Sequence, residues 1–400
     1  MAGLNETPKG DRVHIAFFGL RNAGKSTLVN RLTGQDVAIV SDVAGTTTDP
    51  VSKSMEILPL GPCLVTDTAG LDDEGPLGEM RVKKSLDVLA TTDIAVWVDD
   101  GAATSAAPPA GAAALVAAEE ETVYARFLAA CRARDIAVLH YRRGDDVEVF
   151  RRELAAVRLA DAPRPLVGDL VSAGDLVVCV CPIDESAPKG RLILPQQQVV
   201  RELLDAGASA LVCQPPQLAT ILGRAVAPRP PNPLLPVKFV ITDSQAFKAV
   251  AAVVPPEIPL TSFSIVFARA KGDLAAYCAG ADALAALKDG DRVLISEGCT
   301  HHRQCNDIGT VKLPKWIMAK TGKKLSFEWT SGNSFPEDLS PYALVVHCGG
   351  CMLTRRAVQA RIARCREAGV PITNYGVCIA ACNGITASPD TCMVARVGAT

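Results

Sequence analysis

Apolar runs divide the first third of the chain into the alternating strands and helices of an α/β domain. Val13–Phe18 is a short, mainly apolar run, and Thr27–Leu32 follows it with the apolar spacing of a helix. Further apolar runs at Cys63–Thr66, Ile94–Val98 and Ile136–Leu139 predict further strands. Strands that alternate with helices favour a mainly parallel sheet.

The same alternation returns after a proline-containing linker, Ala162–Pro165. In the middle segment we expect strands at Asp175–Cys181 and Ala208–Cys213, with a helix at Gln197–Asp205 between them. In the last part the pattern predicts strands at Val237–Ile241, Thr261–Ala268, Arg292–Ser296 and Ala343–His347, and helices at Leu274–Leu287 and Arg355–Ala368. We therefore predict an α/β protein of three domains.

Composition restricts where such a protein works. The chain has 400 residues and a net charge of -2, so no broad basic surface for nucleic acid is implied. The alanine-rich stretch 101–118 is interrupted by two prolines, which favours a loop over a membrane span. The polar start of the chain lacks the apolar segment of a signal peptide. Fourteen cysteines without such a signal favour a reducing compartment, and we expect a cytoplasmic protein.

The first strand ends in a phosphate-binding motif. Gly19 to Ser26 reads G-x-x-x-x-G-K-S between a predicted strand and a predicted helix, which is the context that this motif requires. Glycines let successive backbone N–H groups face phosphate oxygens, Lys25 adds a charge, and the Ser26 hydroxyl is a magnesium ligand. The predicted nucleotide-binding residues of this loop are Asn22, Ala23, Gly24, Lys25, Ser26 and Thr27.

Two further loops complete the phosphate side of the site. Thr47, in the sequence GTTTD, could bind magnesium when a third phosphate is present. Asp67 ends the strand that leads into DTAG, where it would hold magnesium through water. The Gly70 amide would contact the terminal phosphate. These loops resemble those of translation-factor-like GTPases of the Era and MnmE type, and the resemblance implies GTP hydrolysis and potassium stimulation through Asn22.

The base side departs from that resemblance. In this family an Asn-Lys-x-Asp motif follows the next core strand, and its aspartate binds guanine. Here the strand at Ile136–Leu139 continues into His140-Tyr141-Arg142-Arg143. Arg143 cannot accept hydrogen bonds from guanine, so the base specificity stays open. Asp145 or Asp146 could substitute if the loop is shifted.

Cysteines and histidines gather near the C-terminal strands. His347-Cys348-Gly349-Gly350-Cys351 is a CxxC motif with a histidine before it, and Cys299 precedes His301 and His302. Three of the five histidines therefore lie beside these cysteines. Because the carboxyl ends of parallel strands share one crevice, Cys299 and the CxxC pair should meet. We predict a metal or iron–sulfur site there.

The number of ligands narrows the choice of metal. Three cysteines, Cys299, Cys348 and Cys351, suit a 4Fe–4S cluster with one non-cysteine position. Three cysteines and a histidine also suit structural zinc. His301, His347 or Asp184 could supply the fourth ligand. Cys305 is a spare thiol, and Cys378, Cys382 and Cys392 are most simply explained by core packing.

The order of motifs over residues 10–380 resembles the FeFe-hydrogenase maturation GTPases, the HydF family. The resemblance rests on the phosphate loop with Asn22 and on eight further motifs, which are GTTTDP, DTAGLDD, PIDESAPKGRLILPQ, TDSQAF, LTSFSIVFARAKGDL, CTHHRQCNDIGTVKLP, HCGGCML and PITNYG. It implies a P-loop GTPase-like domain at 1–162, a small α/β dimerisation domain at 163–236 and a Rossmann-like α/β domain at 237–400 that binds a 4Fe–4S cluster.

The resemblance also implies a function. Members of this family are scaffolds that carry a 2Fe precursor of the hydrogenase H-cluster, made with the radical-SAM maturases HydE and HydG, to the apo FeFe-hydrogenase. It implies a homodimer or tetramer, and GTP with Mg²⁺ and K⁺ as further ligands. An alternative that the GTPase loops alone allow is an RNA-modification or ribosome-associated GTPase with a structural zinc site.

Overall fold

The computed structural model of the protein describes residues 9–33, 51–58, 60–72, 75–100, 123–157, 164–183, 192–223, 236–298, 307–332 and 334–396. The chain divides into two compact units, residues 1–162 and 163–400. The alanine-rich stretch 101–118 lies outside the described residues. Across the described residues, no helix has the length and apolar character needed to cross a membrane.

The first unit is built on a five-stranded sheet of order β2-β3-β1-β4-β5, in which only β2 runs antiparallel to its neighbour. Residues 123–132 form a further helix. The elements of this unit are β1 (Val13–Phe18), α1 (Lys25–Thr33), β2 (Val51–Ile57), β3 (Gly61–Asp67), α2 (Gly75–Val88), β4 (Ile94–Asp99), β5 (Ala137–Arg142) and α4 (Val147–Ala156).

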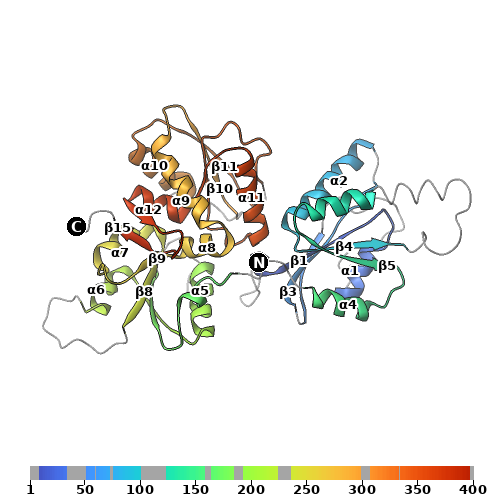
Figure 1. Ribbon diagram of the computed structural model, residues 1–400, viewed down its shortest axis with the longest axis horizontal. Helices are drawn as coiled ribbons and strands as arrows, with labels where there is room; N and C mark the ends of the chain where they lie inside the picture. The colour runs from blue at the N-terminus through green and yellow to red at the C-terminus, as the bar shows by residue number, and fades with distance from the viewer. Residues whose placement is uncertain are drawn as a thin grey trace, which may run out of the picture. The chain divides into compact units, whose positions relative to one another are not determined.

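Strand β1 lies in the middle of this sheet and is buried on both faces. Ile15 and Phe17 pack on the side of α1 and α4, whereas Ala16 and Phe18 pack on the side of α2 and helix 123–132. Figure 1 shows α1 and α4 on one face of the sheet and α2 on the other. Burial on both faces explains why β1 is an apolar run without alternation.

The second unit contains two four-stranded parallel sheets, of order β7-β6-β8-β9 and β11-β10-β12-β13, and a small antiparallel pair, β14 and β15. The strands are β6 (Leu176–Val180), β7 (Ser209–Cys213), β8 (Val237–Thr242), β9 (Leu260–Ser262), β10 (Arg292–Ser296), β11 (Ser326–Thr330), β12 (Leu344–His347), β13 (Ile372–Asn374), β14 (Ile385–Ala387) and β15 (Val394–Arg396). The helices are α5 (Leu194–Asp205), α6 (Leu218–Ile221), α7 (Phe247–Val253), α8 (Phe263–Lys271), α9 (Leu274–Asp282), α10 (Leu313–Thr321), α11 (Arg355–Glu367) and α12 (Tyr375–Cys382). The predicted α/β class is confirmed.

Helix α8 corrects one prediction. We expected a strand at Thr261–Ala268, but the strand ends at Ser262 and a helix begins at Phe263. The Ser262 hydroxyl accepts the Ile265 N–H and caps the helix, at 3.3 Å. Helix α8 runs between the two sheets (Figure 1) and contacts α5, α11 and α12. Because every residue of α8 except Ser264 is buried, its sequence lacks the polar face that marks a helix.

The sheet of the middle segment continues across the domain boundary that we expected between residues 236 and 237. Strand β8 begins at Val237 and pairs with β6, and β9 then pairs with β8. One sheet therefore extends from residue 176 to residue 262. A domain boundary at 236/237 would separate strands of this one sheet, and the limits of the three domains stay a prediction.

Candidate functional site

The phosphate loop joins β1 to α1 and has the backbone geometry that its sequence requires. Gly19 approaches β4 so closely that a Cβ there would lie 2.2 Å from the Val98 carbonyl oxygen. Asn22 and Gly24 have positive φ angles of 62° and 95°. The Lys25 ammonium group donates to the carbonyl oxygens of Gly19 and Leu20, at 3.1 and 2.6 Å. Lys25 thus bends back over its own loop.

Two predicted magnesium ligands meet beside this loop. The Ser26 hydroxyl donates to Asp67 Oδ2 at 2.6 Å, because β3 lies next to β1 in the sheet. Asp67 is 1% exposed, and its Oδ1 accepts no hydrogen bond from the part of the chain that the structure describes. Burial raises the pKa of Asp67, and the Ser26 hydrogen bond and the Lys25 charge oppose this rise. A buried carboxylate oxygen without a donor is suited to a hydrated cation.

The DTAG segment also folds onto the phosphate loop. The Leu71 N–H donates to the Gly19 carbonyl at 3.2 Å, and the Arg21 N–H donates to the Asp72 carboxylate at 2.6 Å. A Cβ at Gly70 would lie 2.9 Å from the Arg21 nitrogen, so the two loops are in close contact there. Thr47, the third predicted magnesium ligand, lies outside the described residues.

The aspartates that we considered for base recognition are engaged locally. Asp145 accepts the Arg142 N–H at 2.9 Å and closes the turn after β5. Asp146 is the N-cap of α4 and accepts the N–H groups of Glu148 and Val149, at 2.7 and 3.4 Å. Each carboxylate thus accepts a backbone N–H of its own turn, and the role of Asp145 or Asp146 in base recognition stays a prediction.

The CxxC motif follows β12 and surrounds a sulfur atom with backbone N–H groups. Cys348 Sγ accepts hydrogen bonds from Gly298 at 3.0 Å and from Gly350 at 3.4 Å. Gly350 has a φ angle of 68°, which an L-residue rarely adopts. Burial raises the pKa of the Cys348 thiol, whereas these two hydrogen bonds act to lower it. Such bonds stabilise a thiolate, the form in which cysteine binds iron.

The contact with Gly298 brings two distant segments together. Gly298 comes just after β10, which pairs with β12 so that Ser296 lies opposite His347. The next residue along the chain is Cys299, which together with Cys305, His301 and Asp184 lies outside the described residues. The described residues themselves contain no group of three histidine, cysteine or acidic side chains arranged to hold a metal ion.

His347, a predicted fourth ligand, has both ring nitrogens engaged. Nδ1 lies 2.7 Å from the Cys348 carbonyl oxygen, and Nε2 lies 3.0 Å from the Arg361 guanidinium. The side chain is fully buried in β12, and burial lowers the pKa of His347 to about 4, with Arg361 adding to the shift. We therefore interpret His347 as a neutral structural residue.

Sequence reasoning missed two buried cations beside the CxxC loop. Arg361 donates to Ser296 Oγ at 3.2 Å, to the Gly332 carbonyl at 2.6 Å and to His347. Lys271 donates to the carbonyl oxygens of Cys351 and Leu353, at 3.3 and 3.1 Å. A signal for Arg361 was present, because Val358, Ile362 and Cys365 form the buried stripe of α11 in which it lies.

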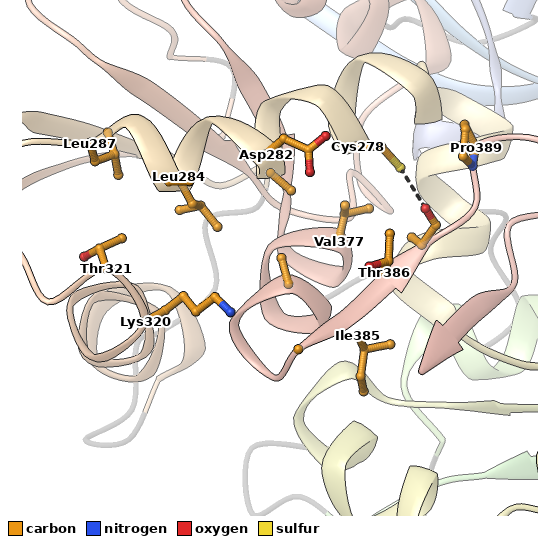
Figure 2. A pocket seen from close by; sticks show the side chains of 15 residues that line it. Cys278, Asp282, Leu284, Leu287, Lys320, Thr321, Val377, Ile385, Thr386 and Pro389 are labelled. Carbon is orange, nitrogen blue, oxygen red and sulfur yellow. Dashed lines mark hydrogen bonds between the residues drawn. The ribbon is translucent and has the colours of Figure 1, made fainter. Parts of the chain in front are cut away.

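A separate pocket of about 610 Å³ lies among α9, α10, α12 and β14 (Figure 2). Cys278 is part of its lining and donates from its thiol to the Ala387 carbonyl oxygen at 3.5 Å. Cys378 and Cys392 are fully buried, in agreement with core packing. Cys382 is half-buried, and a hydrogen bond with Cys378 lowers the pKa of its thiol.

Comparison with protein-family models shows to which family this chain belongs. The model of the hydrogen maturase F dimerization domain matches residues 166–272, and that of the hydrogen maturase F tetramerization domain matches residues 275–388. The chain belongs to the hydrogen maturase F family. It therefore carries domains for self-association, in addition to an N-terminal match with the 50S ribosome-binding GTPase family at residues 14–145.

Individual GTPases are similar to parts of this chain. The tRNA modification GTPase MnmE of Paramagnetospirillum magneticum is 33% identical over 167 residues, which cover 38% of this chain and 37% of that protein. GTPase Der of Xylella fastidiosa is 35% identical over 164 residues, or 38% of this chain and 33% of that protein. Aquifex aeolicus Era bound to GDP and aluminium fluoride overlaps 81% of this chain and 94% of its own, at a TM-score of 0.26 and 16% identity. The chain thus spans about a third of the length of MnmE and Der.

Proposed function

We propose that this protein is a carrier in the maturation of the FeFe-hydrogenase H-cluster. In this role a 4Fe–4S cluster is held by Cys348 and Cys351 together with Cys299, and a 2Fe precursor is the cargo. The observation that carries the proposal is the contact between Gly298 and Cys348 Sγ, because it puts the segment that leads into Cys299 at the CxxC motif. The donors fit the group, since the Cys348 thiol accepts two N–H groups and lies close enough to the Cys351 thiol for the two to interact.

The fourth ligand would decide how cargo is released. A 4Fe–4S cluster with three thiolates leaves one iron for an exchangeable ligand, to which an incoming diiron unit can bridge. Since both nitrogens of His347 are engaged, the remaining candidates are His301 and Asp184. Lys271 and Arg361 hold the loop and the strand in place, so the exchange would leave the cysteines undisturbed.

The nucleotide unit would act as a switch. Ser26 and Asp67 would hold Mg²⁺ with Thr47, and Asn22 would bind potassium at the tip of the phosphate loop. Nucleotide binding would reorder the loops around Thr47 and Gly70 and so change the contacts with the two maturases HydE and HydG and with the apo-hydrogenase. Turnover measured in potassium and in sodium tests the role of Asn22, and Asn22→Ala should remove any difference between the two salts.

Anaerobic reconstitution tests the cluster proposal. Wild-type protein should take up about four iron atoms per chain and become brown. Imidazole should alter the EPR spectrum of the reduced cluster if one position is exchangeable. Cys348→Ser should lose most of the iron, whereas Cys278→Ser is a matched control, because its hydroxyl can still donate to the Ala387 carbonyl oxygen.

Three outcomes would contradict this assignment. A Cys348→Ser protein that still takes up a full cluster would exclude Cys348 as a ligand. A colourless protein with one tightly bound zinc would favour the alternative, a GTPase with a structural zinc site. An EPR spectrum that imidazole leaves unchanged would argue against an exchangeable position.

A further inference from the structure

Helix α12 carries two cysteines that the proposed function does not use. Cys378 and Cys382 are four residues apart, so both side chains lie on the same face of the helix. Cys378 is fully buried in the core that α12 shares with α10 and with strands β10 and β12. Cys382, the last residue of the helix, is half-buried, and the two thiols are hydrogen-bonded to each other. The pair therefore reaches from the core to the surface.

A cation lies beside the outer end of this pair. Helix α10 packs against α12, and Lys320, in the last turn of α10, is exposed. Lys320 and Ala381, the residue before Cys382, line the same pocket, and the Lys320 side chain points toward the C-terminal end of α12 (Figure 2). An ammonium group in this position stabilises a negative charge on the Cys382 sulfur.

Another half-buried cysteine on the wall of this pocket provides a comparison. The hydrogen bond from Cys378 lowers the pKa of Cys382, and the Lys320 charge adds to this, although burial and the C-terminal end of the helix dipole oppose it. Burial instead raises the pKa of Cys278 to about 11, and its thiol donates to the Ala387 carbonyl oxygen. The two cysteines are thus both half-buried, but only Cys382 has neighbours that stabilise its thiolate.

We propose that Cys382 is a reactive thiolate that exchanges with the disulfide of a low-molecular-weight thiol, and that Cys378 and Lys320 activate it. The Cys382 sulfur attacks one sulfur of the small disulfide, whose S–S bond breaks. A mixed disulfide forms on Cys382, and the other half leaves as a thiolate. The small disulfide is the oxidant, and Cys378 keeps its proton because it is buried away from the reagent. The site uses none of the cysteines proposed above to hold a cluster.

Thiol labelling of the full-length, anaerobically reconstituted protein is the direct test, with each modified cysteine located by mass spectrometry. At pH 7 iodoacetamide should alkylate Cys382 about tenfold faster than Cys278, because the thiolate is the nucleophile. Oxidised glutathione should add one glutathionyl group to Cys382 and none to Cys278, and dithiothreitol should remove it.

Four variants test the roles of the two neighbours. Cys378→Ser keeps a hydroxyl that can donate to the Cys382 sulfur, whereas Cys378→Ala does not, so only the alanine variant should slow alkylation of Cys382, by about fivefold. Lys320→Met removes the charge but keeps the length of the side chain, and it should slow the reaction by about threefold. Lys315→Met, at another exposed position of α10, is the matched control and should leave the rate unchanged.

Three results would overturn the proposal. The first is wild-type Cys382 that reacts no faster than Cys278. The second is rapid alkylation of Cys382 without any exchange with oxidised glutathione, which would exclude the disulfide as its reagent. The third is a Cys378→Ala or Lys320→Met variant that reacts as fast as wild type, which would exclude activation by that neighbour. The rate at Cys278 in the same sample is an internal standard, because a loosened fold would raise both rates.

Discussion

The phosphate loop and the CxxC loop are built alike, but their polar groups are satisfied differently. Each follows a parallel strand and uses glycine to bring backbone N–H groups to one point. Beside the phosphate loop, at the end of β3, nothing in the described chain donates to the buried Asp67 Oδ1. In the CxxC loop the N–H groups already donate to Cys348 Sγ. The first site thus leaves a buried acceptor for a ligand, whereas in the second the backbone already positions a sulfur atom.

This difference predicts where mutation unfolds the protein and where it only weakens binding. The CxxC loop and its strand are held by the buried cations Lys271 and Arg361. Replacing such a group leaves its buried acceptors without a donor, so changes there should destabilise the second unit. The nucleotide site contains a carboxylate whose ionisation is opposed by burial, so its removal should stabilise the first unit. Three substitutions test this contrast.

The largest effect is expected at Arg361. Arg361→Met keeps the length of the side chain and its packing but leaves His347 Nε2, Ser296 Oγ and the Gly332 carbonyl without this donor. Removing one partner from such a buried network costs about 3 kcal/mol. We expect a free energy of unfolding lower by that amount for the unit 163–400, measured by urea denaturation with native-state hydrogen exchange to identify the unit.

A matched control lies on the same helix. Arg366 is 69% exposed and pairs with Asp273 at 3.2 Å on the surface. Arg366→Met should therefore change the free energy of unfolding by about 0.5 kcal/mol. Equal losses in the two variants would mean that Arg361 contributes no more than a surface ion pair.

A smaller effect of opposite sign is expected at Asp67. Asp67→Asn still accepts the Ser26 hydrogen bond but removes a buried charge, so the ligand-free protein should gain about 1 kcal/mol of stability at neutral pH. The pKa of Asp67 is raised above its ordinary value of 3.8, so the wild-type residue loses stabilising effect as the pH rises through the folded-state pKa. The gain in the variant should therefore appear at neutral pH and disappear in acid.

The affinity of Asp67→Asn for nucleotide should fall, although its stability rises. The same variant loses a charged magnesium partner, so MgATP and MgGTP should bind about tenfold more weakly. Urea denaturation at several pH values and calorimetry measure the two effects on one preparation. A variant that is less stable than wild type at pH 7 would show that the Lys25 charge outweighs burial at this carboxylate.

The sequence predicted the nucleotide loop well because that loop is local. Gly19, Gly24 and Lys25 lie in one short stretch, and their conformational demands can be read from residue type alone. Most strands of the sheets were also predictable from apolar runs. The run at Thr261–Ala268 was misread because α8 is buried all round, and its burial comes from elements distant in sequence.

The position of the CxxC motif was predictable from the sequence, but the residues that support it were not. Cys348 and Cys351 follow from spacing, and the meeting with the segment after β10 follows from parallel strand order. The contact of the His347 ring with Arg361, 14 residues away, did not follow from the position of His347 beside the cysteines. The buried stripe of α11 marks Arg361 as buried, but its partners on β10 and β12 cannot be read from a single sequence.

The smallest effect separates backbone strain from the contact with sulfur. Gly350 and Gly384 have φ angles of 68° and 71°, so alanine should cost each about 1 kcal/mol in folding stability. Only at Gly350 would the new Cβ meet a neighbour, Val358 Cγ2 at 3.1 Å, and only there does the N–H donate to Cys348 Sγ. Gly350→Ala should therefore also lose iron faster to a chelator, as measured by the fading of the brown colour. If Gly384→Ala loses iron equally fast, the effect belongs to general destabilisation, and the N–H group of Gly350 has no particular role at the cluster.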